Sequence, residues 1–236
     1  MDQRLDPAPA KVPSRIRLEG RFVTVEPLDP ATHAIPLYTG SHGDGKDELW
    51  RYLWDGPYPD RGAFEAALRQ KAASQDPLSF AIVDRRSGLA VGHAAYLRIT
   101  PEHRVIEIGS ILFTPALQKT AGATEAMYLM ARHAFEDLGY RRYEWKCDSL
   151  NTPSRHAALR LGFQFEGIFR QHMIIKGRNR DTAWFSMLDS EWPLRKANFE
   201  RWLDPSNFDG QGNQKESLSA LNGVAAQTVI RHSGGE

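Results

Sequence analysis

The sequence predicts a single α/β domain in which helices pack on both faces of a mixed β-sheet. Two observations carry this prediction. The nearly uninterrupted apolar run Val105–Phe113 is typical of a buried central strand, and the helical repeat of Gly122–Leu138 follows it closely. The chain then continues as strand, helix and strand to about residue 170, which is the order of a βα unit whose helices cover a twisted sheet.

The remaining elements follow from hydrophobic period and turn residues. Strands are expected where apolar residues alternate or cluster, at Arg21–Glu26, Ser79–Asp84, Ala90–Arg98, Val105–Phe113, Tyr143–Cys147, Ile168–Ile175 and Thr182–Leu188. Helices are expected at Asp29–Tyr38, Lys46–Trp54, Asp60–Ala73, Gly122–Leu138, Pro153–Leu161 and Pro193–Trp202. Gly139 and Gly162 are typical residues for the ends of two of these helices.

Composition at the two ends divides the chain into three parts. Residues 1–18 contain Pro7, Pro9 and Pro13 and are expected to form an extended arm. Residues 19–203 form the predicted domain. Residues 204–236 are rich in Gly, Ser, Asn and Gln, so we expect a disordered tail with room for one short helix near residues 217–227.

Charge and cysteine content exclude several classes of protein. The chain has 236 residues and a formal net charge of +1, which argues against a broadly basic nucleic-acid binder and against an anionic membrane surface as partner. The single cysteine, Cys147, excludes an intramolecular disulfide framework and a cysteine-based zinc site. No apolar run approaches the roughly 18–20 residues of a membrane span, and the first residues lack the apolar core of a secretory signal. We therefore expect a cytoplasmic protein without a metal.

The segment between the apolar strand and the strongest helix has the features of an anion site. Small residues occupy positions 121, 122 and 123, so that the backbone can approach a ligand, and Lys119 adds a positive charge. The first N–H groups of a helix lack intrahelical partners and carry partial positive charge, which suits a pyrophosphate. The alternative is a tight junction whose small residues serve packing only.

Two motifs in this region resemble those of the GNAT superfamily of acyl-CoA-dependent N-acyltransferases. Gln118, Ala121 and Ala123 fall on the family's pyrophosphate loop, with Ala121 in place of its first glycine. The second motif lies about 33 residues further on, where Asn151–Ser154 (Asn-Thr-Pro-Ser) is followed by Leu-Gly-Phe and then Glu-Gly at 161–167. The resemblance covers roughly residues 20–190 and is nearest to the branch that contains the ribosomal-protein N-terminal acetyltransferases.

The resemblance implies a fold and a set of binding residues. The sheet would be mostly antiparallel and twisted, with its two central parallel strands, Val105–Phe113 and Tyr143–Cys147, splayed apart at a bulge. The exposed backbone of Ile111, Leu112 and Phe113 would bind the acyl carbonyl and the pantetheine, as an added strand does. Asn151 would orient the pantetheine amides. The diphosphate of acetyl-CoA, the implied cosubstrate, would bind at Gln118, Lys119, Thr120, Ala121, Gly122, Ala123 and Thr124.

The transfer of an acyl group to an amine needs groups that move protons. Glu107 is the candidate general base, because a carboxyl group in an apolar strand is disfavoured as an anion and so has reason to take up a proton. The alternative is a structural ion pair with Arg98 or Arg104, and Glu144 and Asp148 are weaker rivals for the role of base. Many relatives use a tyrosine as the acid, at the position of Ala158 here, and the resemblance offers Ser154 instead; the alternative for Ser154 is a residue that only begins a helix.

Other chemistry-bearing residues have simpler interpretations. His133 and Glu136 share a helix face but lack a third ligand, and Cys147 has no evident histidine partner, so it is read as buried filler. Four basic residues surround one turn, and a solvated hairpin tip explains them best; they are Arg170, Lys176, Arg178 and Arg180.

The sequence thus predicts an N-acetyltransferase that moves an acetyl group from acetyl-CoA to a primary amine by direct attack in a ternary complex. The acceptor could be a protein N-terminus or a small amine, and a monomer or a homodimer would both serve. Two alternatives remain. One is a non-catalytic acyl-CoA-binding regulator, favoured by Ala121 and Ala158. The other is an RNA- or ribosome-binding module that uses the basic turn, which the neutral net charge argues against.

Overall fold

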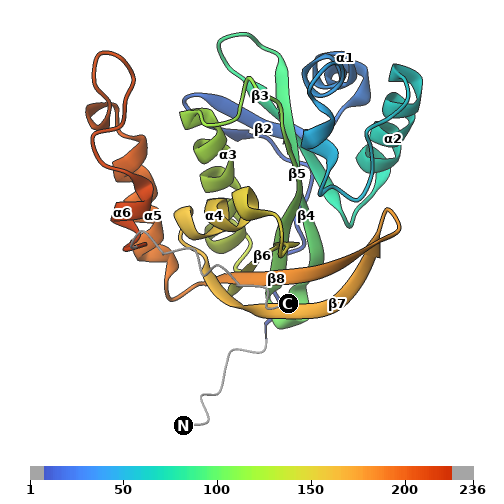
Figure 1. Ribbon diagram of the computed structural model, residues 1–236. Coiled ribbons are helices and arrows are strands. Elements are labelled where there is room, and N and C mark those ends of the chain that lie inside the picture. Colours follow the sequence, from blue (N-terminus) through green and yellow to red (C-terminus); the bar gives the residue numbers. More distant parts are fainter. Residues whose placement is uncertain (1–7, 225–236) are drawn as a thin grey trace, which may run out of the picture.

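A computed structural model describes residues 8–224, which form one eight-stranded sheet with helices on both faces (Figure 1). The strand order is β1-β2-β3-β4-β5-β6-β8-β7. The strands are β1 Leu18–Glu19, β2 Val23–Pro27, β3 Leu78–Asp84, β4 Ala90–Thr100, β5 Val105–Phe113, β6 Arg142–Asp148, β7 Gln164–Ile175 and β8 Arg178–Leu188. Neighbouring strands pair antiparallel throughout, except that β5 and β6 run parallel. The predicted mixed, mostly antiparallel sheet is therefore confirmed.

Two helices cover one face of the sheet and the other helices lie on the opposite side (Figure 1). The helices are α1 Pro30–Ser41, α2 Arg61–Ala73, α3 Ala121–Arg132, α4 Thr152–Arg160, α5 Trp192–Leu203 and the short α6 Leu218–Leu221. On the α1/α2 face, Leu37, Phe64 and Leu68 are fully buried in a core of their own. On the α3 face, a larger core includes Ile106, Ile108 and Met130. Alternating side chains of the central strands supply both cores.

Helix α3 begins and ends where its sequence dictates. The Thr120 hydroxyl accepts a hydrogen bond from the Ala123 N–H at 3.2 Å and so caps the first turn. The helix continues past Arg132 as a wider π-type turn to Asp137, and Gly139 follows with a φ of +79°. The predicted helix Gly122–Leu138 thus divides into two forms of helix in series.

The segment between α1 and α2 contains less helix than the sequence suggests. The predicted helix Lys46–Trp54 is reduced to one 3₁₀ turn, Asp47–Trp50. Gly43, Gly45 and Gly56 flank this turn with positive φ values, which bend the chain where a helix cannot continue. The Trp50 ring is buried, and its indole N–H donates to the Ser41 carbonyl at 2.8 Å.

The residues after α5 differ from the expected disordered tail. Leu218, at the start of α6, is fully buried, and the Asn222 amide donates to the Arg160 carbonyl at 2.9 Å. The Trp202 indole N–H donates to Gln214 at 2.7 Å. The polar composition misled the prediction here because asparagine and glutamine side chains satisfy backbone groups while single apolar residues anchor the segment. Residues 225–236 of the predicted tail lie outside the described residues.

The described part of the N-terminal arm is held against the domain by backbone hydrogen bonds. Residues 8–17 form neither helix nor strand, and the Ala10 and Lys11 N–H groups donate to the Pro101 and Leu138 carbonyls. Its first residues, 1–7, lie outside the described part. None of the helices between residues 8 and 224 has the length and apolar character that a bilayer span requires.

Candidate active site

The two central parallel strands separate halfway along their length. β5 and β6 pair from Val105 with Arg142 to Ile108 with Trp145, and no pairing follows. β5 nevertheless continues to Phe113, and β6 continues to Asp148. The backbone groups of the second half of β5 that point towards β6 are therefore left without a strand partner. The splay expected from the resemblance is present.

A bulge in β5 produces the separation. Across the β4–β5 pair, Ala95 lies opposite Gly109, and His93 lies opposite Leu112, so one residue of β4 faces two of β5. Ser110 sits in this bulge with a φ of +49°, which is uncommon for a residue with a side chain. The bulge increases the local twist and turns the end of β5 away from β6.

The side chains beyond the bulge alternate between the two cores. Leu112 is buried against the α1/α2 core, whereas Ile111 and Phe113 are partly exposed and pack against the α3 core. The Phe113 carbonyl accepts a hydrogen bond from the Gln118 side chain at 3.0 Å. Gln118 therefore closes the turn that follows β5.

The start of α3 presents unpaired N–H groups next to this turn. Lys119 is exposed and adopts a left-handed backbone conformation, with a φ of +60°. The Ala121 and Gly122 N–H groups precede the first intrahelical hydrogen bond, and neither donates to another group within the described part of the chain. Ala121 and Ala123 remain partly exposed, whereas Thr124 is buried. The geometry fits an anion bound at the helix start.

Gly122 is small for a reason that the sequence could not show. A Cβ atom at this position would lie 2.9 Å from Cγ1 of Val23 on β2. The absence of a side chain therefore lets α3 pack closely on the sheet, and only the backbone N–H of Gly122 is available to a ligand. The packing role that the sequence offered as an alternative therefore applies at Gly122, and its N–H remains free for a ligand.

The start of α4 lies at the end of β6, on the other side of the strand opening. The Asn151 side chain caps the helix, since its Oδ1 accepts from the Ser154 N–H at 3.1 Å. The Ser154 hydroxyl accepts from the Trp145 indole N–H at 3.0 Å and lies beside the Cys147 thiol. Cys147 is buried, and burial raises the pKa of its thiol, as expected for filler. Ala158, at the family's tyrosine position, is fully buried.

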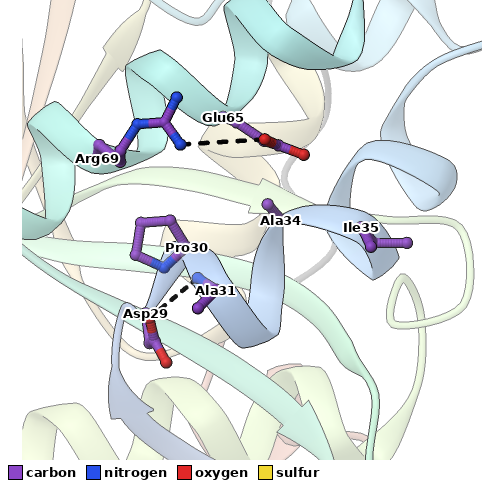
Figure 2. Close-up of a pocket in the computed structure, with 7 residues that line it drawn as sticks. All are labelled: Asp29, Pro30, Ala31, Ala34, Ile35, Glu65 and Arg69. Carbon is purple, nitrogen blue, oxygen red and sulfur yellow. Dashed lines mark hydrogen bonds and ion pairs between the residues drawn. The ribbon is translucent and has the colours of Figure 1, made fainter.

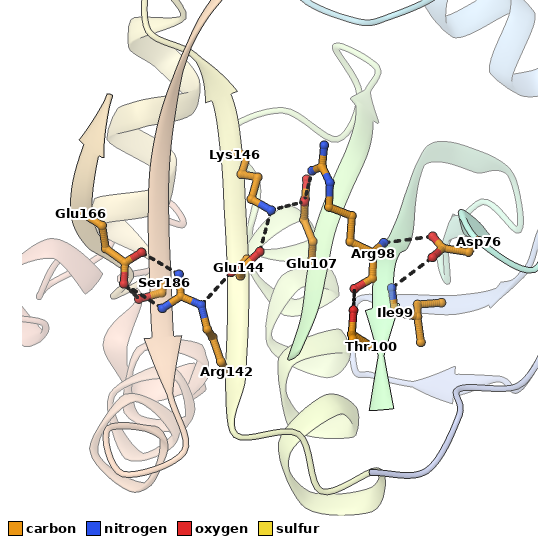
Figure 3. Close-up of polar contacts among 10 residues, drawn as sticks. All are labelled: Asp76, Arg98, Ile99, Thr100, Glu107, Arg142, Glu144, Lys146, Glu166 and Ser186. Carbon is orange, nitrogen blue, oxygen red and sulfur yellow. Dashed lines mark hydrogen bonds and ion pairs between the residues drawn. The ribbon is translucent and has the colours of Figure 1, made fainter. Parts of the chain in front are cut away.

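Glu107 lies just before the strand opening, within a ladder of alternating charges across the sheet (Figure 3). Its Oε2 pairs with Arg98 and, at 3.0 Å, with Lys146. Lys146 also pairs with Glu144 at 2.6 Å, and the ladder continues through Arg142 to Glu166 on β7. Glu107 and Glu144 face each other in register, so Lys146 between them offsets the repulsion of two like charges. The ion pair with Arg98 that the sequence left open is formed.

The α1–α2 segment and the β7–β8 hairpin meet over this part of the sheet. The Lys176 ammonium at the hairpin tip donates to the Trp50 carbonyl at 2.8 Å, and the Tyr52 hydroxyl donates to the Leu150 carbonyl at 3.2 Å. Beneath them Asp55 pairs with Lys71 at 2.8 Å. Although burial opposes it, Lys71 holds the pKa of Asp55 below its usual range.

The burial of two residues was not foreseen from the sequence: His93 was not singled out, and the prediction of a solvated position for Arg180 is wrong. His93 on β4 is 2% exposed, neither ring nitrogen has a hydrogen-bond partner of good geometry, and burial lowers its pKa to about 3. Arg180 on β8 is 6% exposed, although Arg170 and Arg178 of the same hairpin are exposed as expected. The predicted strand began at Thr182; starting it at Arg178 would have placed Arg180 on one face with Thr182 and Trp184.

A separate hollow between α1 and α2 is unrelated to the strand opening (Figure 2). Its volume is about 380 Å³, and it is lined by Asp29, Pro30, Ala31, Ala34, Ile35, Glu65 and Arg69. None of these residues belongs to β5, β6 or segment 118–124. Within residues 8–224, no three His, Cys, Asp or Glu side chains are grouped to hold a metal ion.

Comparisons with known proteins agree with this geometry. Residues 23–164 match the profile of the family described as Acetyltransferase (GNAT) domain. A curated relative, the uncharacterized N-acetyltransferase p20 of Bacillus licheniformis, is 32% identical over 113 residues, which are 48% of this chain and 63% of that protein. The chain thus matches less than two thirds of that relative's length.

Solved structures extend the likeness to nearly the whole chain. A GCN5-related N-acetyltransferase from Brucella melitensis superimposes with a TM-score of 0.90 at 47% identity, covering 92% of this chain and 98% of that one. The microcin C7 self-immunity acetyltransferase MccE, solved with acetyl-CoA and AMP, shares the fold alone, with a TM-score of 0.62, 19% identity and coverage of 72% and 93%. The profile match spans more than half of the chain, and the splayed strands lie inside it. This protein therefore belongs to the GNAT acetyltransferase family.

Proposed function

We propose that the protein is an acetyl-CoA-dependent N-acetyltransferase whose acceptor is a primary amine. One observation carries the proposal: the strand opening between β5 and β6 lies beside the unpaired N–H groups that begin α3. A long thiol ester with a diphosphate needs both features, an open strand edge for its pantetheine and an anion site for its phosphates.

The residues around the opening divide the binding task. The Ala121 and Gly122 N–H groups and the positive end of α3 hold the diphosphate, with Lys119 as an added charge. The open edge of β5 from Ile111 to Phe113 pairs with the pantetheine amides as an additional strand. The Asn151 side chain uses its oxygen to cap α4, and its nitrogen makes no hydrogen bond within residues 8–224. This nitrogen is therefore available to the pantetheine from the β6–α4 side of the strand opening.

The reaction is direct transfer. Acetyl-CoA supplies an activated thioester: the amine nitrogen forms a bond to the carbonyl carbon, the carbon–sulfur bond breaks, and the proton lost by the amine is balanced by one gained at the thiolate. The backbone N–H groups of β5 beyond the bulge stabilise the negative charge on the carbonyl oxygen. This part of β5 is held in place by its pairing with β4, so its free N–H groups need little reorganisation during the reaction.

Two side chains are candidates for the proton transfers. Both cation contacts of Glu107 are made to Oε2, so Oε1 lies outside the ion pairs and can accept the amine proton through a water molecule. Ser154 lies at the start of α4, and its hydroxyl, held by the Trp145 indole, can donate to the leaving thiolate. Asn151 then has two tasks, because capping α4 also fixes the position of Ser154.

The proposal also covers the branch of the family, the cellular compartment and the oligomeric state. The motifs Asn151–Ser154 and 161–167 resemble the ribosomal-protein N-terminal acetyltransferases, which favours a protein N-terminus as acceptor. We place the protein in the cytoplasm, with acetyl-CoA as cosubstrate and as a monomer or homodimer. Buried Ala158, at the family's tyrosine position, is the feature that favours a non-catalytic acyl-CoA-binding regulator instead.

A screen separates the two functions. Primary amines and short peptides with free N-termini are incubated with acetyl-CoA, and the release of free thiol is followed, with acetyl-CoA hydrolysis in the absence of amine as the control. An enzyme releases thiol only when an accepted amine is present. Tight acetyl-CoA binding without thiol release across the panel would favour the regulator.

A further inference from the structure

Arg180 is a buried cation that forms no close ion pair within the described part of the chain. Its side chain is 6% exposed, its Nε has no hydrogen-bond partner, and it forms no ion pair within 4 Å among residues 8–224. Burying an unpaired charge is costly, and burial lowers the pKa of Arg180. Lys146, the other buried cation of this sheet face, instead contacts two carboxylates, those of Glu107 and Glu144. Arg180 therefore differs from Lys146 in lacking a paired carboxylate, and a bound anion would supply one.

The position of Arg180 is at the strand opening. The last β6–β8 pair joins Asp148 and Thr182, so Arg180 lies just beyond the carboxyl end of β6 and on the same face as Thr182. Its charge interacts with Asp148 and Cys147 of β6 and also with Glu107 of β5. The guanidinium thus lies within electrostatic reach of both strands that separate.

One oxygen of each neighbouring carboxylate is already bonded to another group. Oε2 of Glu107 is shared by Arg98 and Lys146. Oδ1 of Asp148 accepts the Leu150 N–H at 2.9 Å, in the loop that leads to α4. The guanidinium therefore keeps its donors for a group from outside the described chain.

The surroundings of Arg180 are formed by three segments that contact one another. Lys176, on the same hairpin as Arg180, is tied to the Trp50 carbonyl, and the Tyr52 hydroxyl is tied to the Leu150 carbonyl. The α1–α2 segment thus lies against both the hairpin and the β6–α4 loop. Trp184, on the same face of β8, adds a buried indole N–H without a partner. An acceptor that enters here meets hydrogen-bond donors and a positive charge.

We infer that Arg180 binds an anionic group of the acceptor, a carboxylate or a phosphate carried on the same molecule as the amine. This inference rests on the proposed acetyl transfer and narrows its substrate class. A guanidinium presents two parallel N–H donors that match either group, and a buried one gains more from pairing than an exposed one. An acceptor without the anion leaves Arg180 unpaired, so the site selects against it.

Matched acceptors test the inference by activity. Amino acids are compared with their carboxamides, and phosphoethanolamine is compared with ethanolamine, so that each pair differs in the anion while keeping the amine. We expect kcat/KM to be about 10–100-fold higher for the anionic member of at least one pair, as for a charge-assisted hydrogen bond. The pair that shows this difference identifies the anion as carboxylate or phosphate.

Variants then locate the effect. Arg180→Gln is expected to remove the preference while leaving the KM for acetyl-CoA unchanged. Arg178→Gln, an equal change of charge on the exposed part of the same hairpin, is expected to retain the preference. Equal rates for both members of every pair in the wild type would overturn the inference. So would an equal loss in Arg180→Gln for anionic and neutral acceptors, because Arg180 would then act on the thioester and not on the acceptor.

A binding measurement covers the case in which Arg180→Gln does not fold. Titration of the wild-type protein with the same acceptors, in the presence of coenzyme A, is followed by calorimetry. Binding of an anionic amine but not of its neutral partner supports the inference, and equal or absent binding of both contradicts it. The proposed acetyl transfer fails separately, by the absence of thiol release with every acceptor, anionic or neutral.

Discussion

Glu107 has an observed structural role and a proposed catalytic one, and an exchange for glutamine can separate them. Its carboxylate holds Arg98 and Lys146, and its Oε1 is the candidate acceptor of the amine proton. Glu144 is the control residue, since it lies opposite Glu107 in the β5–β6 register and also pairs with Lys146. Both residues support the ladder of charges, but only Glu107 lies on the strand whose far end forms the open edge.

We predict that Glu107→Gln lowers kcat about 100-fold at neutral pH and that part of the loss is recovered at high pH, where the amine is already deprotonated. Glu144→Gln is expected to lower stability without changing the shape of the pH–rate profile. Steady-state kinetics across pH with both variants provide the measurement. Superimposable profiles for the two variants would leave Glu107 with a structural role only.

His93 makes the stability of the fold depend on pH. Burial lowers its pKa to about 3 from a usual 6.5, so the unfolded chain takes up a proton before the folded one as the pH falls. The unfolded state then binds more protons, and the stability supplied by neutral His93 is fully present above pH 6.5 and is lost below it. Lys71 nearby opposes the protonated form, and Asp55 favours it more weakly.

We therefore expect the contribution of His93 to fall by about 2 kcal/mol between pH 6.5 and pH 5. The measurement is urea unfolding of the wild type and of His93→Gln at the two pH values, because glutamine does not titrate there. His103→Gln, at an exposed position, is the control and should follow the wild type. A constant difference between wild type and His93→Gln at both pH values would show that His93 is not buried as a neutral group.

At the scale of the element, the start of α3 is the proposed binding place of the diphosphate. The start of α2 is a suitable control for the start of α3, because the two helices are capped in the same way. The Asp60 side chain accepts from the Ala63 N–H at 2.8 Å, as the Thr120 hydroxyl accepts from the Ala123 N–H. Ala63 and Ala123 are the third residues of their helices, and both are partly exposed. Only the start of α3 lies beside the open edge of β5.

Ala123→Asp is expected to weaken acetyl-CoA binding at least 10-fold, since a carboxylate at the helix start repels a diphosphate. The melting temperature should stay the same or rise, because an acid in the first turn favours the helix. Ala63→Asp is expected to leave the affinity unchanged. Calorimetry with acetyl-CoA gives the affinities, and an unaltered affinity in Ala123→Asp would remove the diphosphate from the start of α3.

The elements also show how far the sequence predicts the site. β5 was predicted with its observed bounds, Val105–Phe113, because a buried strand needs an unbroken apolar run. Thr120 and Asn151 cap the starts of α3 and α4, and both are residue types that commonly cap a helix. The bulge at Ser110 was expected only from the family resemblance, since no local pattern marks it. The burial of Arg180 depends on how β8 pairs with β6, a non-local fact that no sequence window contains.

At the scale of the whole molecule, the proposed function assigns different tasks to the two faces of the sheet. The face with α3 and α4 offers the helix starts and the open strand edge, where the cosubstrate would bind. The opposite face carries the α1–α2 segment and the charge ladder (Figures 1 and 3), and the strand register places Arg180 on that face too; the amine would enter there. The opening between β5 and β6 joins these two faces, so that the thioester and the amine can meet within the sheet.

A crystal structure of the protein with bound coenzyme A tests this arrangement most directly. We predict diphosphate oxygens within hydrogen-bond distance of the Ala121 and Gly122 N–H groups, and a pantetheine that runs along Ile111–Phe113 between the separated strands. Coenzyme A bound elsewhere on the surface, or a β5–β6 pair closed along its full length, would contradict the account.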